Sequence, residues 1–151
     1  MRQAARRLLI IVALGLAVSM GWQGFDWLSR DLAFTRAKTE VGFWGRGSYQ
    51  PDDATIERTG ERVDALLQAR PNHPAYLGLH ANYAAWRAYW AGEGEVREKF
   101  IQMAANSQYA ALQSRPAHRQ GWQKLLEYTA RSSNGDGLRA QSISRLEALQ
   151  P

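Results

Sequence analysis

Cysteine is absent from this chain of 151 residues. Its absence excludes disulfide frameworks, metal sites built on thiolates and catalysis by a cysteine nucleophile. At roughly 100–200 residues per domain, the length leaves room for one compact domain, so we do not expect a two-domain enzyme with its own cofactor fold. The apolar content of 45% excludes collagen-like and strongly disordered classes of protein.

Catalytic and cofactor-binding motifs are missing as well. The sequence has no G-x-S-x-G and no H-E-x-x-H, and the glycines within 42–47 lack the Lys-Ser/Thr of a phosphate-binding loop. The acidic residues Asp52, Asp53 and Glu57 follow a proline, and we interpret them as the first turn of a helix, where the helix dipole favours negative charge. We therefore expect no enzymatic activity, no cofactor and no metal.

The net positive charge is small beyond the N-terminus. The chain has 19 Lys and Arg against 14 Asp and Glu, a formal net charge of +5. Three of these residues are Arg2, Arg6 and Arg7, and the rest of the chain has 16 basic against 14 acidic residues in mixed order. Because no basic run remains, we expect no binding of nucleic acid.

An uncharged apolar segment from Leu8 to Trp22 follows these three arginines. Fifteen residues of helix rise about 22 Å, which is less than the ~30 Å of the hydrocarbon core, so a spanning helix would continue to Trp27 and Leu28. This pattern predicts a transmembrane signal anchor over residues 1–28. By the positive-inside rule the arginines stay cytoplasmic, so the protein would be a single-pass bacterial inner-membrane protein with its C-terminal domain in the periplasm.

Two other interpretations of the apolar segment remain open. A cleaved signal peptide has the same basic start and short apolar region, and Ala17-Val18-Ser19 would serve as its cleavage site. A buried core helix would also be apolar, although such a helix rarely opens a chain directly behind three arginines.

A repeated segment occupies much of the remaining sequence. Residues 65–86 and 110–131 align at an offset of 45 and are identical at eight of 22 positions. Five of the matches fall in the short pattern L-Q-x-R-P-x-H. We expect this pattern to form a structural junction between helices, with each histidine at the start of its own helix. The junction residues are Arg70, Pro71, His73, Arg115, Pro116 and His118.

Helical spacing of apolar residues runs through the rest of the chain, and no stretch alternates as a strand does. We therefore predict an all-α fold, with a membrane-proximal helix and loop over 29–50 and a repeat domain over 51–151. Because a single helix pair cannot bury its apolar face, the pairs must stack into a short α-solenoid of about two and a half antiparallel hairpins. The predicted helices cover about 26–45, Asp52 to Pro71, Pro74 to about Ala91, 95–114, the segment after Pro116, and 138–149, with a loop over 132–137.

The paired helices and the recurring proline resemble the tetratricopeptide repeat superfamily, whose units pair two helices in 34 residues. Pro116 and Pro151 are 35 residues apart, whereas Pro71 and Pro116 are 45 apart. The longer spacing implies longer helices or an insertion near Gly92–Gly94.

More narrowly, the layout is similar to that of the VpsP family of exopolysaccharide biosynthesis proteins. This resemblance implies a small, membrane-anchored helical protein with protein partners in a membrane polysaccharide-assembly complex. It covers about residues 25–131 and depends on Arg70–Leu77 with Tyr83 and Trp86, and on Arg115-Pro116 with Trp122.

Aromatic residues are frequent, with six Trp, six Tyr and four Phe. Tyr83, Trp86 and Trp90 share one stripe of a predicted helix, whereas Tyr89 projects elsewhere. Such a stripe packs between solenoid helices, or it forms a surface on which rings stack against sugars or a partner peptide, with Arg87 beside it.

We therefore predict a scaffold or adaptor of exopolysaccharide biosynthesis or export. Two alternatives remain open. One is a carbohydrate-binding module that uses the aromatic stripe to contact polysaccharide. The other is a peptide-binding assembly factor for secretion, pilus or cytochrome biogenesis.

Overall fold

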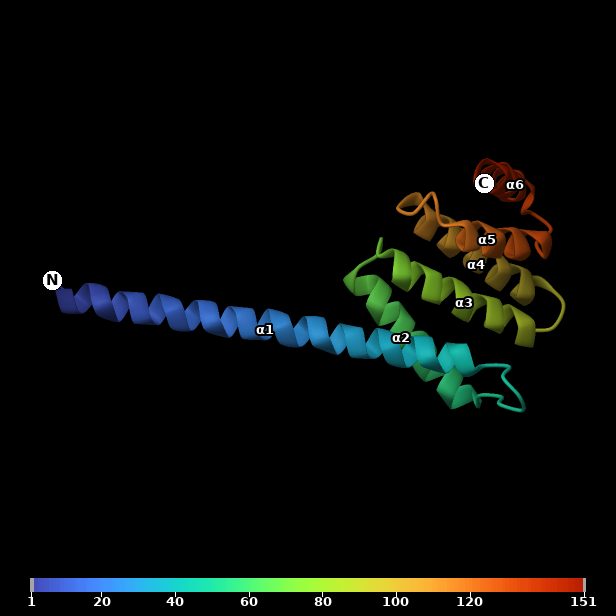
Figure 1. The fold of residues 1–151 in the computed structure, drawn as a ribbon. Coiled ribbons are helices and arrows are strands. Elements are labelled where there is room, and N and C mark those ends of the chain that lie inside the picture. Colours follow the sequence, from blue (N-terminus) through green and yellow to red (C-terminus); the bar gives the residue numbers. More distant parts are fainter. Residues whose placement is uncertain (1, 151) are drawn as a thin grey trace.

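The computed structural model describes the backbone of residues 2–150 and the side chains of residues 15, 19–22, 24, 25 and 27–150. The described residues form six α-helices and no strand (Figure 1). The prediction of an all-α fold is therefore confirmed. The helices are α1 (Arg2–Phe43), α2 (Asp53–Ala69), α3 (Pro74–Trp90), α4 (Glu95–Gln113), α5 (Arg119–Ala130) and α6 (Asp136–Ala148).

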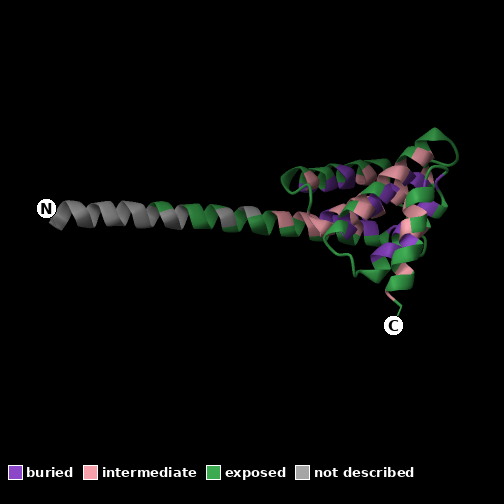
Figure 2. Ribbon diagram, turned by 90° about the horizontal axis from the view of Figure 1, so that it is seen from above, coloured by how far each residue is buried: buried purple, intermediate pink, exposed green. Residues whose placement is uncertain are grey.

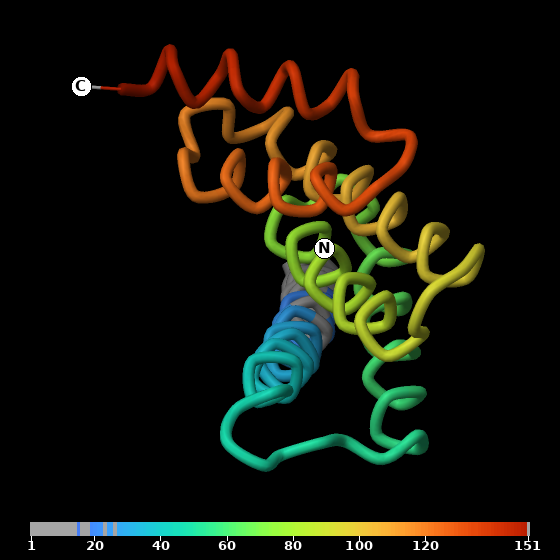
Figure 3. The backbone as a smooth tube through the Cα atoms, turned by 90° about the vertical axis from the view of Figure 1, so that its right-hand side faces the viewer, coloured from blue at the N-terminus to red at the C-terminus, as the bar shows by residue number. Residues whose placement is uncertain are grey.

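Over the described chain the helices pack as three consecutive pairs, α1/α2, α3/α4 and α5/α6. The chain reverses direction between the two helices of a pair, and the pairs follow one another from α1 at one end of the stack to α6 at the other (Figure 1 and Figure 3). The most extensive helix interface joins α3 to α4. The predicted helical solenoid is confirmed, with three pairs where the sequence predicts about two and a half.

The repeated sequence pattern forms the same turn twice. The His73 N–H donates to the Arg70 carbonyl at 3.1 Å, and the His118 N–H donates to the Arg115 carbonyl at 3.0 Å. A proline follows each arginine, at the turn position that its fixed φ suits. His73 and His118 are the N-cap residues of α3 and α5, although neither side chain caps its helix by a hydrogen bond.

The longer spacing between Pro71 and Pro116 comes from longer helices and not from an insertion. α3 and α4 have 17 and 19 residues, whereas α5 and α6 have 12 and 13, so the earlier pair is 11 residues longer. A tight turn around Gly92 and Gly94 joins α3 to α4, and both glycines have positive φ. Glycine tolerates this conformation because it has no Cβ.

Two groups of buried residues make up the core. Figure 2 colours the buried residues purple, and they lie where the helices pack against one another. The first lies among α1, α2 and α3 and includes Ala37, Val41 and Trp44. The second lies mainly among α3, α4 and α5 and is centred on Trp122 and Leu125. Residues from the segment predicted as membrane-proximal therefore belong to the core of the helical domain.

The N-terminal part of α1 projects beyond the other five helices (Figure 1). Within the part of the chain with described side chains, no helix is long and apolar enough to cross a membrane. Arg2, Arg6, Arg7 and most of the Leu8–Trp22 segment lie outside that part. The signal anchor therefore stays a prediction.

Candidate binding groove

A groove follows one side of the stacked helices, between α3 and α5. It consists of two hollows of about 260 Å³ and 580 Å³, and Asn82 and Lys124 line both of them. α3 lines the groove with Ala75, Gly78, Asn82, Ala85 and Tyr89, which recur every three or four residues and so share one helix face. We call this feature the α3–α5 groove.

The larger hollow is the aromatic end of the groove, defined by Trp86, Tyr89, Trp90 and Tyr128. Trp86 and Trp90 are stacked, with ring centroids 5.4 Å apart, and the Trp44 ring centroid lies 5.0 Å from that of Trp90. Tyr89 is 70% exposed and meets Trp86 edge-on, with ring centroids 5.7 Å apart. The aromatic rings are thus held by one another and by the core.

The loop after α1 forms one wall of the aromatic end, through residues between Gly45 and Gln50. Glu40 Oε1 fixes this loop by accepting hydrogen bonds from Trp44 Nε1 at 3.1 Å and from the Tyr49 hydroxyl at 2.5 Å. The hydrogen bond to Glu40 raises the pKa of Tyr49. Gly45 has positive φ, and a Cβ there would collide with the Trp86 ring, so glycine is needed for this close approach.

A polar contact joins α3 to α5 where the two hollows meet. Asn82 Oδ1 accepts hydrogen bonds from the Tyr128 hydroxyl at 3.0 Å and from Lys124 Nζ at 3.1 Å. Burial raises the pKa of Tyr128 to about 12, and the nearby Glu127 carboxylate adds to the shift. Tyr128 therefore stays protonated at neutral pH and donates this hydrogen bond.

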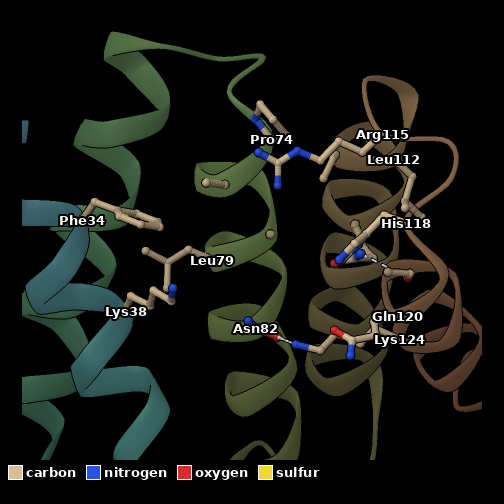
Figure 4. A pocket seen from close by; sticks show the side chains of 15 residues that line it. Phe34, Lys38, Pro74, Leu79, Asn82, Leu112, Arg115, His118, Gln120 and Lys124 are labelled. Atoms are coloured by element: carbon tan, nitrogen blue, oxygen red, sulfur yellow. Dashed lines mark hydrogen bonds between the residues drawn. The ribbon is translucent and has the colours of Figure 1, made fainter. Parts of the chain in front are cut away.

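The smaller hollow is the basic end of the groove (Figure 4). Lys38 of α1, Arg115 after α4, and His118 and Lys124 of the α5 segment line it, and its lining contains no Asp or Glu. Figure 4 shows the Arg115 side chain extending toward Pro74 at the start of α3. Buried Gln108 stabilises the wall, because its Nε2 donates to the Gly121 carbonyl at 3.1 Å.

The groove contains only part of the predicted aromatic surface. Trp86 and Trp90 line it, but Tyr83 is 9% exposed and belongs to the core. Arg87 donates to the Tyr83 hydroxyl at 3.1 Å and lies 4.9 Å from the Phe100 ring centroid, away from the groove. Tyr89, which the sequence analysis placed apart from the stripe, is the most exposed ring at the aromatic end.

Of the predicted junction residues, too, only some line the groove. Arg115 and His118 line the basic end, whereas Arg70, Pro71 and Pro116 do not. Sequence analysis did not single out Lys38, Asn82, Lys124, Tyr128 and Arg131, which come from three helices and a helix end. The spacing of Lys124, Tyr128 and Arg131 on one face of α5 is a signal that could have identified three of them.

A second polar pair was also missed by the sequence analysis. His80 Nδ1 of α3 lies 2.7 Å from Ser107 Oγ of α4, and burial lowers the pKa of His80 while the Asp64 charge opposes that shift. Neither residue lines the groove. Among the residues whose side chains are described, no group of three His, Asp or Glu side chains could hold a metal ion.

No family model, curated protein or solved structure matches this chain. The α3–α5 groove and the exposed apolar side chains of α1 are the features of the molecule that bear on its function.

Proposed function

We propose that this protein is a membrane-anchored, periplasm-facing helical-repeat scaffold of exopolysaccharide biosynthesis or export. Its α3–α5 groove would bind partner subunits of a membrane polysaccharide-assembly complex. The groove is the observation that carries the proposal, because it presents Trp86, Tyr89 and Arg131 in one hollow. Trp, Tyr and Arg are the residue types that contribute most to protein interfaces.

The stacking of the helix pairs into a solenoid supports a scaffold. Each pair shares its core with the next, and the R-P-x-H turn marks the junctions before α3 and α5. Such stacking leaves one extended face available for partners. A peptide-binding assembly factor for secretion, pilus or cytochrome biogenesis would use the same face, so the identity of the partner decides between the two.

Exposed apolar side chains on α1 support the anchor. Met20, Trp22, Phe25, Trp27 and Leu28 are 50–76% exposed. Large apolar side chains gathered on a surface indicate an interaction site, and tryptophan favours the interface between membrane and water. With three arginines preceding the apolar segment, this arrangement fits a helix that continues from the bilayer into the periplasmic domain.

The test is capture of the tagged full-length chain from solubilised membranes at native expression, after crosslinking. We expect recovery of polysaccharide-synthesis or export subunits, and their loss from a Tyr89→Ala/Arg131→Ala variant, whose two side chains are exposed and line the groove. The control is Ile143→Ala, which changes an exposed apolar side chain on α6. Recovery of no such subunit, or equal recovery by the groove variant, would contradict the proposal.

A further inference from the structure

We propose that the α3–α5 groove binds an acidic glycan chain directly, holding uronic-acid carboxylates at the basic end and stacking sugar rings at the aromatic end. This inference deepens the proposed function, on which the choice of a glycan rests. A scaffold that binds only protein partners would not need to bind a glycan in this groove.

The charge of the basic end favours an anion. Lys38, Arg115 and Lys124 converge on one hollow from three separate elements, and no carboxylate lines that hollow to neutralise them. Lys124 is already oriented by its hydrogen bond to the neutral amide of Asn82. The carboxylate of Glu127 lines the aromatic end, together with Lys124 and Arg131, and not the basic end. Burial lowers the pKa of the neighbouring His73, and the cations Arg70 and Arg115 lower it further.

The distribution of acidic residues along the helices agrees with this charge. α2, α4 and α6 each carry Asp or Glu in the first turn, as the helix dipole favours. α3 and α5 begin at the basic end, and they have no acidic residue in the first turn. The basic end therefore has positive side chains and two positive helix ends without the usual negative partners.

The aromatic end offers contacts for sugar rings and hydroxyl groups, which a simple anion does not need. The rings of Trp86, Tyr89 and Trp90 offer faces and edges for the C–H faces of sugars, and the amides of Asn82 and Gln50 can hydrogen-bond hydroxyl groups. From Ala75 to Tyr89, α3 rises about 21 Å along the groove, which is long enough for several sugar units. A uronic-acid chain presents carboxylates and ring faces together, whereas a phosphate or a lipid headgroup would use the basic end alone.

The experiment is calorimetric titration of the full-length protein, in detergent, with short oligomers of galacturonic acid. The matched ligand is the same oligomer with its carboxylates methyl-esterified, which keeps the rings and removes the charge. We expect the acid form to bind, the ester to bind about tenfold more weakly or not at all, and binding to weaken as salt is raised from about 50 to 200 mM. Equal binding of acid and ester, or no binding, would overturn the inference.

Three further ligands test whether the groove instead binds an acidic peptide, free phosphate or a lipid headgroup. A short oligomer of glutamic acid, inorganic phosphate and glycerophosphoglycerol, the water-soluble headgroup of phosphatidylglycerol, are titrated under the same conditions. The inference expects each to bind more weakly than the uronic-acid oligomer. Tighter binding of any of the three would assign the groove to that class of ligand and overturn the inference.

A double variant in the basic end and a matched double variant elsewhere test where the oligomer binds. Lys38→Gln/Arg115→Gln should weaken binding of the uronic-acid oligomer about fivefold to tenfold, whereas the control Arg62→Gln/Lys99→Gln removes the same charge elsewhere and should leave binding unchanged. Equal loss in both variants would show non-specific charge attraction. If the glycan fails to bind while assembly subunits are still captured from membranes, this inference fails and the proposed function stands.

Discussion

Tyr128 of α5 donates a hydrogen bond to Asn82 of α3 at 3.0 Å and thereby ties the third helix pair to the second. Lys124 shares the same acceptor at 3.1 Å, so one amide oxygen fixes two side chains of the groove. Tyr128 is the repeat equivalent of Tyr83, which instead packs against α2, where a Cβ at Gly60 would meet its hydroxyl group. The same repeat position is therefore buried in the core in both copies, and in the second copy its side chain also lines the groove.

Removal of the Tyr128 hydroxyl should loosen this junction. We expect Tyr128→Phe to lower the free energy of unfolding by about 1 kcal/mol, because Asn82 Oδ1 then loses a buried donor. Tyr89→Phe is the control, since its ring is largely exposed. Urea unfolding of both variants measures the difference, and equal stability of the two would contradict this role of Tyr128.

The ionisation of Tyr128 should make the stability of the protein depend on pH in the alkaline range. Its pKa is raised to about 12 in the folded protein from an ordinary 10.0, so the unfolded chain ionises first as the pH rises. The corresponding stability is present below pH 10.0 and is lost as the pH rises toward about 12. Unfolding temperature should therefore fall less steeply over this range in Tyr128→Phe than in the wild type; parallel curves would count against the raised pKa.

Trp44 is the main ring beneath the aromatic end. It is 2% exposed, and its ring centroid lies 5.0 Å from that of Trp90. We expect Trp44→Ala to cost about 3–5 kcal/mol of stability, through lost burial and a cavity. Trp22→Ala, at an exposed tryptophan of α1, should leave thermal unfolding unchanged. A small effect of Trp44→Ala would mean that the loop and α3 do not depend on this ring.

Gly60 allows α2 and α3 to approach closely. A Cβ at this position would collide with the Tyr83 hydroxyl, which is held by Arg87 at 3.1 Å. Gly60→Ala should therefore destabilise the protein by about 1–3 kcal/mol. Gly78 has nothing within 4 Å of an added Cβ, so Gly78→Ala should stabilise α3 by up to about 1 kcal/mol. Calorimetric unfolding measures the change in stability for both variants. A stabilising effect of Gly60→Ala would contradict the close packing of Tyr83 against Gly60.

Glu98 anchors the loop between α5 and α6. Its Oε1 accepts hydrogen bonds from Ser132 Oγ at 2.6 Å and from the Ser133 N–H at 3.2 Å, and these bonds lower its pKa from the ordinary 4.5. The stability that they provide is present above pH 4.5 and is lost as the pH falls below it. Between about pH 5 and 3, the wild type should lose stability faster than Glu98→Gln.

The control for this acid prediction is Glu95→Gln, which changes another carboxylate in the first turn of α4. Its acid unfolding should follow the wild type. If Glu98→Gln also follows the wild type, the loop is held by other contacts.

Local sequence signals predict the helices of this protein well. Prolines, glycines and the 3/4 spacing indicate the helix positions, and the repeat identifies two equivalent turns before α3 and α5. The place of Trp44 could not be predicted, because it follows the last residue of α1 and its partners come from a helix 30 or more residues away.

The groove was harder to predict than the helices. Helical spacing places Tyr83, Trp86 and Trp90 on one stripe, but their burial depends on how α1 and α2 cover α3. Lys38, Arg115 and Lys124 have unrelated sequence contexts and meet only because three helix pairs stack. Contacts between such distant residues are set by tertiary packing, which the spacing of residues along one helix does not reveal.

Photocrosslinking from residue 89 in native membranes tests the use of the α3–α5 groove most directly. A photoreactive amino acid replaces Tyr89 at the rim of the groove or, as the control, Ile143 on α6. The account predicts crosslinks from position 89 to a polysaccharide-synthesis or export subunit or to glycan, and none of these from position 143. Equal crosslinking from both positions, or none from position 89, would contradict it.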